Sequence, residues 1–255
     1  MSAELTDGTA RMTQRLLVDA GVGSGMRVLD VGCGRGDVAL LVARIVGDEG
    51  EVIGIDRDRA SIELARRRAR EMELTRVRFE EHDLHELGSE YGTFDAVVGR
   101  RVLMYLADPV DALRQLARLV RTDGRVSFQE IESTMPPVSL APYPLPEQIR
   151  NWIWRTVERE GANIHMGLGL AAAFARAGLA DIEVRAEAIV ETPTTSYPTA
   201  AIVRVMLPRI VARGVATAEE IDIETLETRL ADERKRLDGV YISGLVFGAW
   251  GRKPT

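Results

Sequence analysis

An apolar run that ends in three closely spaced glycines is the feature that most constrains the fold of this chain. Residues 28–31 are apolar apart from Asp30, and Gly32, Gly34 and Gly36 follow them directly. Apolar residues at helical spacing then occupy positions 37–46. Glycine lets the backbone turn tightly and lets a ligand approach the main chain without meeting a Cβ atom. The pattern therefore predicts a buried strand, a ligand-binding loop and a helix.

The same alternation of strand and helix patterns continues along the chain. Strands are predicted at residues 27–31, 51–56, 77–80, 94–98, 125–129, 181–190 and 240–250, and helices at 37–46, 59–72 and 109–120. Strands that alternate with helices indicate a mostly parallel sheet with helices on both faces. The sequence thus predicts an α/β, doubly wound, Rossmann-like fold with seven strands.

The regular alternation of strand and helix patterns ends after residue 130. Five prolines between positions 135 and 146 predict an irregular segment that cannot join the interior of a sheet. Further helices are predicted at 147–160, 168–177, 197–215 and 218–237. We interpret residues 1–255 as a single domain whose two added segments, about 133–165 and 193–236, form a helical cap or lid.

Charge and composition exclude several classes of protein. The chain has 33 Lys and Arg against 39 Asp and Glu, a net charge of −6, which disfavours a surface built to hold nucleic acid. Its one cysteine, Cys33, excludes an intramolecular disulfide and a cysteine-based zinc site. The first seven residues carry Glu4 and Asp7 instead of a basic leader, and every apolar run is shorter than the roughly 20 residues that span a bilayer. We expect a cytoplasmic monomer or homodimer with no membrane partner.

The glycine loop departs from two common phosphate-binding motifs. A Gly-x-Gly-x-x-Gly motif that starts at Gly32 would place Asp37 at its third glycine, where a pyrophosphate would meet a carboxylate. No Gly-x-x-x-x-Gly-Lys-Ser/Thr sequence occurs either. The loop therefore favours neither NAD nor a P-loop nucleotide.

Acidic residues follow three of the predicted strands. Asp56, at the tip of the second strand, can accept hydrogen bonds from both hydroxyls of a ribose. Asp83, after the third strand, can accept from the exocyclic amine of adenine while Leu84 packs near the ring. Together with Asp30 they predict an electronegative site, which suits a cationic nucleoside.

These residues resemble those of a known enzyme family. The runs 28–36, 54–58 and 94–98, together with Asp83, are similar to the class I S-adenosylmethionine-dependent methyltransferases. Residues 98–106, followed by Asp108 and a proline, further resemble the UbiE-like branch that acts on small molecules. The resemblance implies an enzyme that converts S-adenosyl-L-methionine into S-adenosyl-L-homocysteine.

The resemblance also implies roles for individual residues. Gly32 and Gly34 would approach the methionine part of the cofactor, and Asp30 would organise the loop and the bound amino group. The family more often has Asn, Ser, Asp or His where this chain has Arg100. The expected cofactor-binding set is Asp30, Gly32, Cys33, Gly34, Asp56, Arg57, Asp83, Leu84 and Arg100. Cys33 fits a small, partly buried filler of the loop better than a nucleophile, because no sequence signature pairs it with a base.

Acceptor contacts and a proton acceptor are expected outside the cofactor loop. The proposed acceptor-binding residues are Arg101, Tyr105, Trp152 and Met166, although the tryptophan and the methionine fit an ordinary core equally well. Arg100 and Arg101 could instead hold an anionic group of the acceptor. His165 and Glu130 are the candidate proton acceptors, with Glu132 next in order.

The acceptor that these residues predict is a small, largely apolar metabolite, methylated at O, N or C, in secondary or quinone-like metabolism. Two alternatives stay open, a cofactor-retaining isomerase or cyclase and a non-catalytic cofactor-binding protein. His82 and His85 flank Asp83, but a metal there would compete with the adenine pocket, so no metal is expected.

Overall fold

The computed structural model describes residues 8–88 and 91–255. The acidic residues Glu4 and Asp7, on which the expectation of no leader peptide rests, lie outside the described residues. The chain divides into two compact units. The first comprises Met1–Glu130, Met166–Ala186 and Phe247–Thr255, and the second comprises Ile131–His165 and Glu187–Val246.

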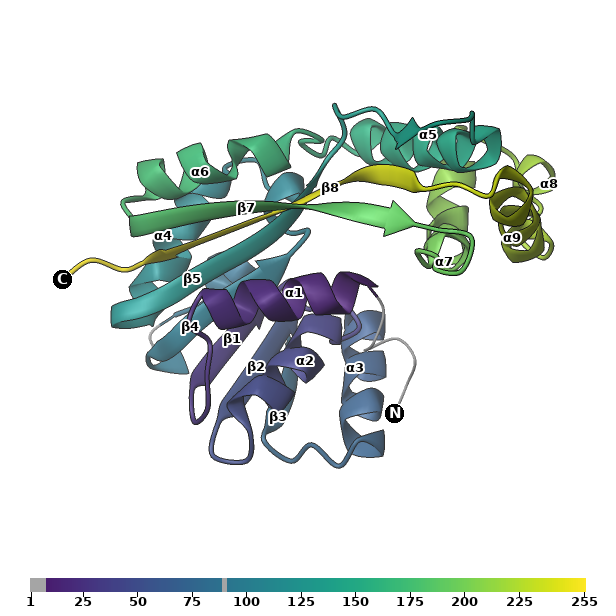
Figure 1. The fold of residues 1–255 in the computed structure, drawn as a ribbon. Helices are drawn as coiled ribbons and strands as arrows, with labels where there is room; N and C mark the ends of the chain where they lie inside the picture. The colour runs from purple at the N-terminus through teal and green to yellow at the C-terminus, as the bar shows by residue number, and fades with distance from the viewer. Residues whose placement is uncertain (1–7, 89–90) are drawn as a thin grey trace. The chain divides into compact units, whose positions relative to one another are not determined.

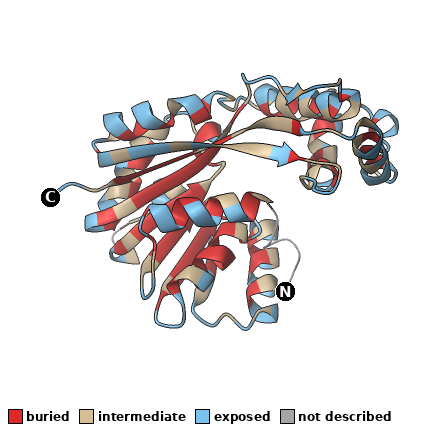
Figure 2. Ribbon diagram, in the orientation of Figure 1, coloured by how far each residue is buried: buried red, intermediate tan, exposed pale blue. Residues whose placement is uncertain are grey.

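An eight-stranded sheet of order β3-β2-β1-β4-β5-β8-β6, with β7 paired to β8, confirms the predicted α/β class. The pairs β1–β2, β2–β3, β1–β4 and β4–β5 are parallel. The strands are β1 (Arg27–Val31), β2 (Glu51–Asp56), β3 (Val77–Glu81), β4 (Phe94–Arg100), β5 (Val120–Glu132), β6 (Val138–Ser139), β7 (Ala180–Glu191) and β8 (Tyr241–Arg252). Because most residues of β1, β2 and β4 and the second half of β5 are buried, these strands form the centre of the core of the first unit (Figure 2).

Helices cover both faces of the sheet in the first unit. Figure 1 shows α1 and α2 on one face and α4 and α6 on the other. The helices of this unit are α1 (Gly8–Asp19), α2 (Asp37–Val46), α3 (Arg59–Glu71), α4 (Pro109–Leu119) and α6 (Met166–Ala177), with the short 3₁₀ helices η2 (Leu84–Glu86) and η4 (Leu103–Tyr105). This is the doubly wound arrangement that the alternating pattern predicted.

Capping residues fix the beginnings of two of these helices. The Asp58 carboxylate accepts a hydrogen bond of 3.0 Å from the Ser61 N–H at the start of α3. The Asp108 carboxylate accepts one of 2.9 Å from the Asp111 N–H, and Pro109 occupies the first turn of α4. Both caps satisfy N–H groups that have no partner within the helix, so the helices begin where the sequence pattern places them.

The second unit consists mainly of helices from the two segments that were predicted to form a cap. They are α5 (Pro144–Arg159), α7 (Thr199–Ala212), α8 (Ala218–Ile221) and α9 (Leu226–Leu237), and α5 packs against both α7 and α9. The two segments, far apart in sequence, thus share one core. Their use as a lid stays a prediction.

Three elements differ from the sequence prediction. The N-terminal helix α1 was not predicted, because Thr9 and Thr13 stand among its buried positions and weaken the apolar pattern. The predicted helix 218–237 is divided into α8 and α9, since Asp222 has a left-handed backbone with φ of 45°. The sheet has eight strands instead of seven because the proline-rich segment contributes the two-residue strand β6 at one end of the strand order. Among the described helices, none has the length and apolar character needed to cross a membrane.

Candidate functional site

The order of the strands predicts a ligand-binding crevice at the carboxyl ends of β1 and β4. The chain goes from β1 to β2 and β3 on one side and then crosses to β4 and β5 on the other. Ligands of open α/β sheets bind where the strand order reverses in this way. Asp30 lies near the end of β1, Asp56 at the end of β2 and Arg100 at the end of β4. The fold therefore gathers these three residues of the predicted site around one crevice.

Asp30 is a buried carboxylate that lacks a partner. Its exposed fraction is 1%, and among the described residues neither of its oxygens has a hydrogen-bond partner. Burial raises the pKa of Asp30 to about 8, although the positive charge of Arg100 and the Ala39 N–H, which lies outside hydrogen-bond geometry, act in the opposite direction. A buried carboxylate without partners is costly, so its place beside the glycine loop favours a ligand with a positive charge and N–H donors.

The glycine loop leaves room for a ligand at one position. Gly34 has φ of 51°, and a Cβ atom built there would meet nothing within 4 Å. At Gly32, with φ of 62°, a Cβ atom would instead lie 2.7 Å from the Val102 side chain. Gly32 therefore permits close packing of the loop after β4, while Gly34 keeps its backbone open to a ligand.

Asp56 connects the end of β2 to the glycine loop. Its Oδ2 accepts a hydrogen bond of 2.8 Å from the Gly34 N–H, and its Oδ1 accepts one of 2.9 Å from the Asp58 N–H. Each carboxylate oxygen can accept a second hydrogen bond, so Asp56 can hold the loop and also bind a hydroxyl pair. Arg57, the next residue, is exposed.

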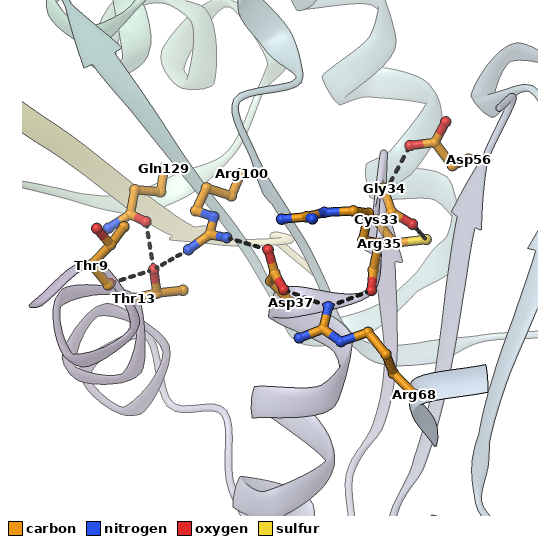
Figure 3. A network of polar contacts seen from close by, with 10 residues as sticks. All are labelled: Thr9, Thr13, Cys33, Gly34, Arg35, Asp37, Asp56, Arg68, Arg100 and Gln129. Carbon is orange, nitrogen blue, oxygen red and sulfur yellow. Dashed lines mark hydrogen bonds and ion pairs between the residues drawn. The ribbon is translucent and has the colours of Figure 1, made fainter. Parts of the chain in front are cut away.

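A polar network lies beside this loop (Figure 3). The Arg100 guanidinium is 3.5 Å from the Asp37 carboxylate and donates a hydrogen bond of 3.3 Å to the Thr13 hydroxyl. Asp37 also contacts the Arg68 guanidinium at 2.6 Å, and the Thr13 hydroxyl lies 2.7 Å from Gln129 Oε1. These contacts fix Arg100 between α1 and α2.

The charge of Asp37 is stabilised by the same network. Burial acts to raise the pKa of Asp37, but the hydrogen bond from Arg68 and the charge of Arg100 outweigh it and lower the pKa. From the sequence, Asp37 was identified only as the residue in place of a third glycine, and Thr13 and Gln129 were not predicted. The four-residue spacing of Thr9 and Thr13, which puts both on one helix face, was the available signal.

Asp83 and Leu84 lie beyond the end of β3, and both are half-buried. Asp83 accepts a hydrogen bond of 2.9 Å from the His85 N–H and caps η2. The His82 N–H donates to the Asp56 carbonyl at 3.0 Å, so this turn is joined to the end of β2. The adenine-binding role of Asp83 and Leu84 stays a prediction.

Cys33 packs inside the loop. It is buried, with 7% exposed, and its N–H donates to the Ile55 carbonyl at 2.9 Å. Burial raises the pKa of the Cys33 thiol, which keeps it protonated. These features agree with a small filler and not with a reactive thiolate.

Glu130 and the loop after β4 form a second buried arrangement. Glu130 is fully buried, and its Oε1 accepts hydrogen bonds of 2.9 and 2.8 Å from the N–H groups of Val102 and Leu103. Burial raises the pKa of Glu130 to about 7, against the effect of these two hydrogen bonds, of the Arg101 charge and of the Met104 N–H. Arg101 and Tyr105 belong to the same loop, and Tyr105 is 43% exposed. Their acceptor-binding role, and proton transfer by Glu130, stay predictions.

The other predicted residues are divided between the two units. His165 and Trp152 belong to the second unit, where Trp152 is buried in α5. Met166 is buried at the first position of α6 in the first unit. The structure places each of them within its own unit, and their use in binding an acceptor stays a prediction.

His165 has a carboxylate beside its ring. Its Nδ1 lies 3.1 Å from Glu132 Oε1, and that oxygen also accepts hydrogen bonds from the N–H and the hydroxyl of Thr134. The Glu132 side chain is completely buried, whereas that of His165 is 54% exposed. An ionised carboxylate accepts hydrogen bonds and cannot donate one. Glu132 therefore favours the His165 tautomer with the proton on Nδ1, which leaves Nε2 as an acceptor.

Within residues 8–88 and 91–255, no group of three or more His, Cys, Asp or Glu side chains is arranged to hold a metal ion.

Comparison with known proteins agrees with this geometry. A family profile described as a methyltransferase domain matches residues 23–160, more than half of the chain. The 2-phytyl-1,4-naphtoquinone methyltransferase of Synechococcus elongatus is 32% identical over 140 residues, which are 54% of this chain and 60% of that protein. The ubiquinone/menaquinone biosynthesis C-methyltransferase UbiE of Idiomarina loihiensis is 33% identical over 132 residues, 51% of this chain and 53% of that protein.

A solved structure shares the fold over almost the whole chain. The YcgJ protein from Bacillus subtilis superposes with a TM-score of 0.63 at 20% identity and covers 96% of this chain and 99% of its own. The curated relatives, in contrast, match this chain over somewhat more than half of their own lengths.

Proposed function

Because the chain belongs to the methyltransferase-domain family, we propose that it transfers a methyl group from S-adenosyl-L-methionine to a small, largely apolar acceptor. The quinone-methylating relatives confirm the resemblance to the UbiE-like branch. They also support an acceptor with a quinone-like or phenolic ring, methylated at oxygen, nitrogen or carbon. A cytoplasmic location and a monomeric or homodimeric state remain predictions of the sequence.

The observation that carries the proposal is the unpartnered carboxylate of Asp30. It lies at the crevice where the strand order reverses, beside a glycine whose backbone is open on one side. A ligand with an ammonium group would provide the missing hydrogen bonds. The residues present thus fit the amino-acid end of S-adenosyl-L-methionine, and Asp56 fits its ribose hydroxyls.

The cofactor, when bound, supplies an activated methyl group on a positively charged sulfur. The contribution of this chain is then to bind the cofactor and the acceptor, to orient them and to exclude water. Asp30, Gly34 and Asp56 would hold the cofactor, and Arg100, fixed by Asp37 and Thr13, would border the crevice. Holding two reactants in line can lower the barrier by roughly 7 to 11 kcal/mol at the extreme.

We assign the proton acceptor to His165, with Glu132 orienting its ring. The contact between Glu132 and Nδ1 leaves Nε2 of this half-exposed ring to take a proton from a hydroxyl, an amine or an enol. Thr134 holds the carboxylate through two hydrogen bonds, which limits the freedom of the pair.

The test of the proposed function is incubation with S-adenosyl-L-methionine labelled in the methyl group. We expect label in at least one member of a panel of phenols, naphthoquinols, amines and enols, together with equimolar S-adenosyl-L-homocysteine. Conversion of an acceptor without formation of S-adenosyl-L-homocysteine would favour the isomerase or cyclase alternative. Tight cofactor binding with no turnover of any acceptor would favour the non-catalytic alternative.

Replacing His165 with Asn should lower kcat at least 100-fold, because the amide cannot take up a proton. The dissociation constant of the cofactor should change less than threefold. His85→Asn is the matched control, since the hydrogen bond from His85 to Asp83 is donated by the backbone N–H and does not need the imidazole ring. Equal kcat values for His165→Asn and the wild type would remove His165 from the mechanism.

A further inference from the structure

The three N–H groups that follow β4 all point toward the end of β5. The Arg101 N–H donates to the Gln129 carbonyl at 2.8 Å, and the Val102 and Leu103 N–H groups donate to Glu130 Oε1. Successive N–H groups that converge in this way form a nest, a backbone concavity that binds an anion. Here two of the three N–H groups bind an anion that belongs to the same chain, the carboxylate of Glu130.

The backbone of this loop is strained. Arg101 has φ of 59°, a left-handed conformation that is unfavourable for a residue with a Cβ atom. Val102 follows in the right-handed region, with φ of −116° and ψ of −52°. A strained conformation of this kind costs on the order of 1 kcal/mol or more and persists only where the surroundings hold it. The hydrogen bonds to Glu130 and Gln129 are among the contacts that hold it here.

The loop also contacts the glycine loop. The Val102 side chain fills the space beside Gly32, where a Cβ atom would approach it to 2.7 Å. A shift of residues 101–105 would therefore move Val102 against or away from the proposed cofactor site. The hydrogen bonds of Glu130 thus connect the end of β5 to both the proposed acceptor contacts and the cofactor loop.

We propose that Glu130 is a positioning residue, which fixes the shape of loop 101–105 through the N–H groups of Val102 and Leu103, and that it is not the proton acceptor. Its Oε1 is occupied by two hydrogen bonds. Its Oε2 has no hydrogen-bond partner among the described residues, but the whole side chain is inaccessible to solvent, so an acceptor molecule does not reach this oxygen. Its relevance to turnover rests on the proposed function, but the hydrogen bonds can be tested without any turnover.

The experiment compares Glu130→Gln with Glu130→Leu. The glutamine carbonyl can accept the same two hydrogen bonds, whereas leucine can accept none. For Glu130→Gln we expect hydrogen exchange of the Val102 and Leu103 amides within about threefold of the wild type, and at least a third of its methyl transfer. For Glu130→Leu we expect these two amides to exchange at least 100-fold faster and the cofactor to bind about tenfold more weakly.

Two further variants complete the test. Ser127→Ala is the matched control, because Ser127 is buried in the same strand and its hydroxyl has no hydrogen-bond partner among the described residues. Exchange at Val102 and Leu103 should not change in this control. Should Glu130→Leu fail to fold, Glu130→Asp retracts the carboxylate by one methylene and should still accelerate exchange of both amides.

Two outcomes would overturn the proposal. Unchanged exchange of both amides in Glu130→Leu, or in Glu130→Asp where leucine prevents folding, would show that the carboxylate does not hold the loop. A loss of methyl transfer of 100-fold or more in Glu130→Gln, with amide protection intact, would identify Glu130 as the proton acceptor. If the wild type has no methyltransferase activity, the proposed function fails while the exchange result still decides whether Glu130 holds the loop.

Discussion

Replacing Asp30 with Asn will make the cofactor-free protein more stable at pH 8 and will abolish its stabilisation by S-adenosyl-L-methionine. The pKa of Asp30 is about 8 in the folded protein against 3.8 for the unperturbed group, and burial is the main cause. The folded state therefore binds one more proton than the unfolded state between these two values. Its stability falls as the pH rises through this window and stays low above it.

The asparagine variant has no charge at this position and escapes that loss. At roughly 1.4 kcal/mol for each of the about four pKa units between 3.8 and 8, we expect a gain on the order of 5 kcal/mol in the free energy of unfolding at pH 8. At pH 4 the difference between variant and wild type should almost vanish. Denaturant unfolding at a series of pH values measures the difference in the free energy of unfolding at pH 8 and at pH 4.

In the presence of cofactor, the wild type should gain stability and the Asp30→Asn variant should not. The wild type should gain stability with S-adenosyl-L-methionine by mass action, because the ligand supplies the partner that the carboxylate lacks. Asp30→Asn should show no increase in Tm at millimolar cofactor. Asp37→Asn is the matched control, since the pKa of Asp37 is lowered and its replacement should destabilise the protein. A less stable Asp30→Asn variant at pH 8 would contradict the assignment of Asp30 as an unpartnered acid.

Replacing Asp56 with Ala should weaken cofactor binding at least 100-fold. The substitution removes the acceptor proposed for the ribose hydroxyls, and it also removes the hydrogen bond of 2.8 Å that holds the Gly34 N–H. Two hydrogen bonds to a charged acceptor, each contributing about 1.5 to 3 kcal/mol, account for a loss of this size. Isothermal titration with S-adenosyl-L-methionine and with S-adenosyl-L-homocysteine measures it.

Asp58→Ala provides the comparison for this experiment. Asp58 is also acidic and lies two residues away, but its carboxylate caps α3 through the Ser61 N–H. We expect a modest loss of stability in this variant and a dissociation constant within threefold of the wild type. Binding by Asp56→Ala as tight as that by Asp58→Ala would refute the ribose assignment and remove the central support for the nucleoside site.

Much of the fold could be predicted because local patterns and tertiary packing agree. The bounds of β1, α2 and β2 match the predicted ranges 27–31, 37–46 and 51–56, since glycines follow the first two runs, charged residues follow the third, and no competing pattern crosses them. The missed helix α1 shows the opposite case. Its buried face includes Thr9 and Thr13, whose burial depends on residues distant in sequence such as Gln129.

The proposed cofactor site could be predicted in the same way because its residues follow strand ends. In a parallel sheet these ends meet at one edge, so periodicity and the glycine pattern predict Asp30 and Asp56 there, whereas Arg100 was assigned to the site only through the resemblance to the methyltransferase family. The contacts between side chains could not be predicted. The pairing of Arg100 with Asp37 and Thr13 depends on how α1 and α2 pack, which no local pattern encodes.

Sequence by itself determined the class of fold, the glycine loop, and the acidic residues that point to a cationic nucleoside. Each of these depends on neighbours within a few residues, on spacing and on the direction of the strands. Only the tertiary structure decided that Asp30 is left without a partner, that Glu130 binds the backbone of the loop after β4, and that Glu132 contacts His165. Burial and hydrogen bonding between distant segments are properties of the folded chain, and they determine the protonation of these acids and the hydrogen bonds that they make.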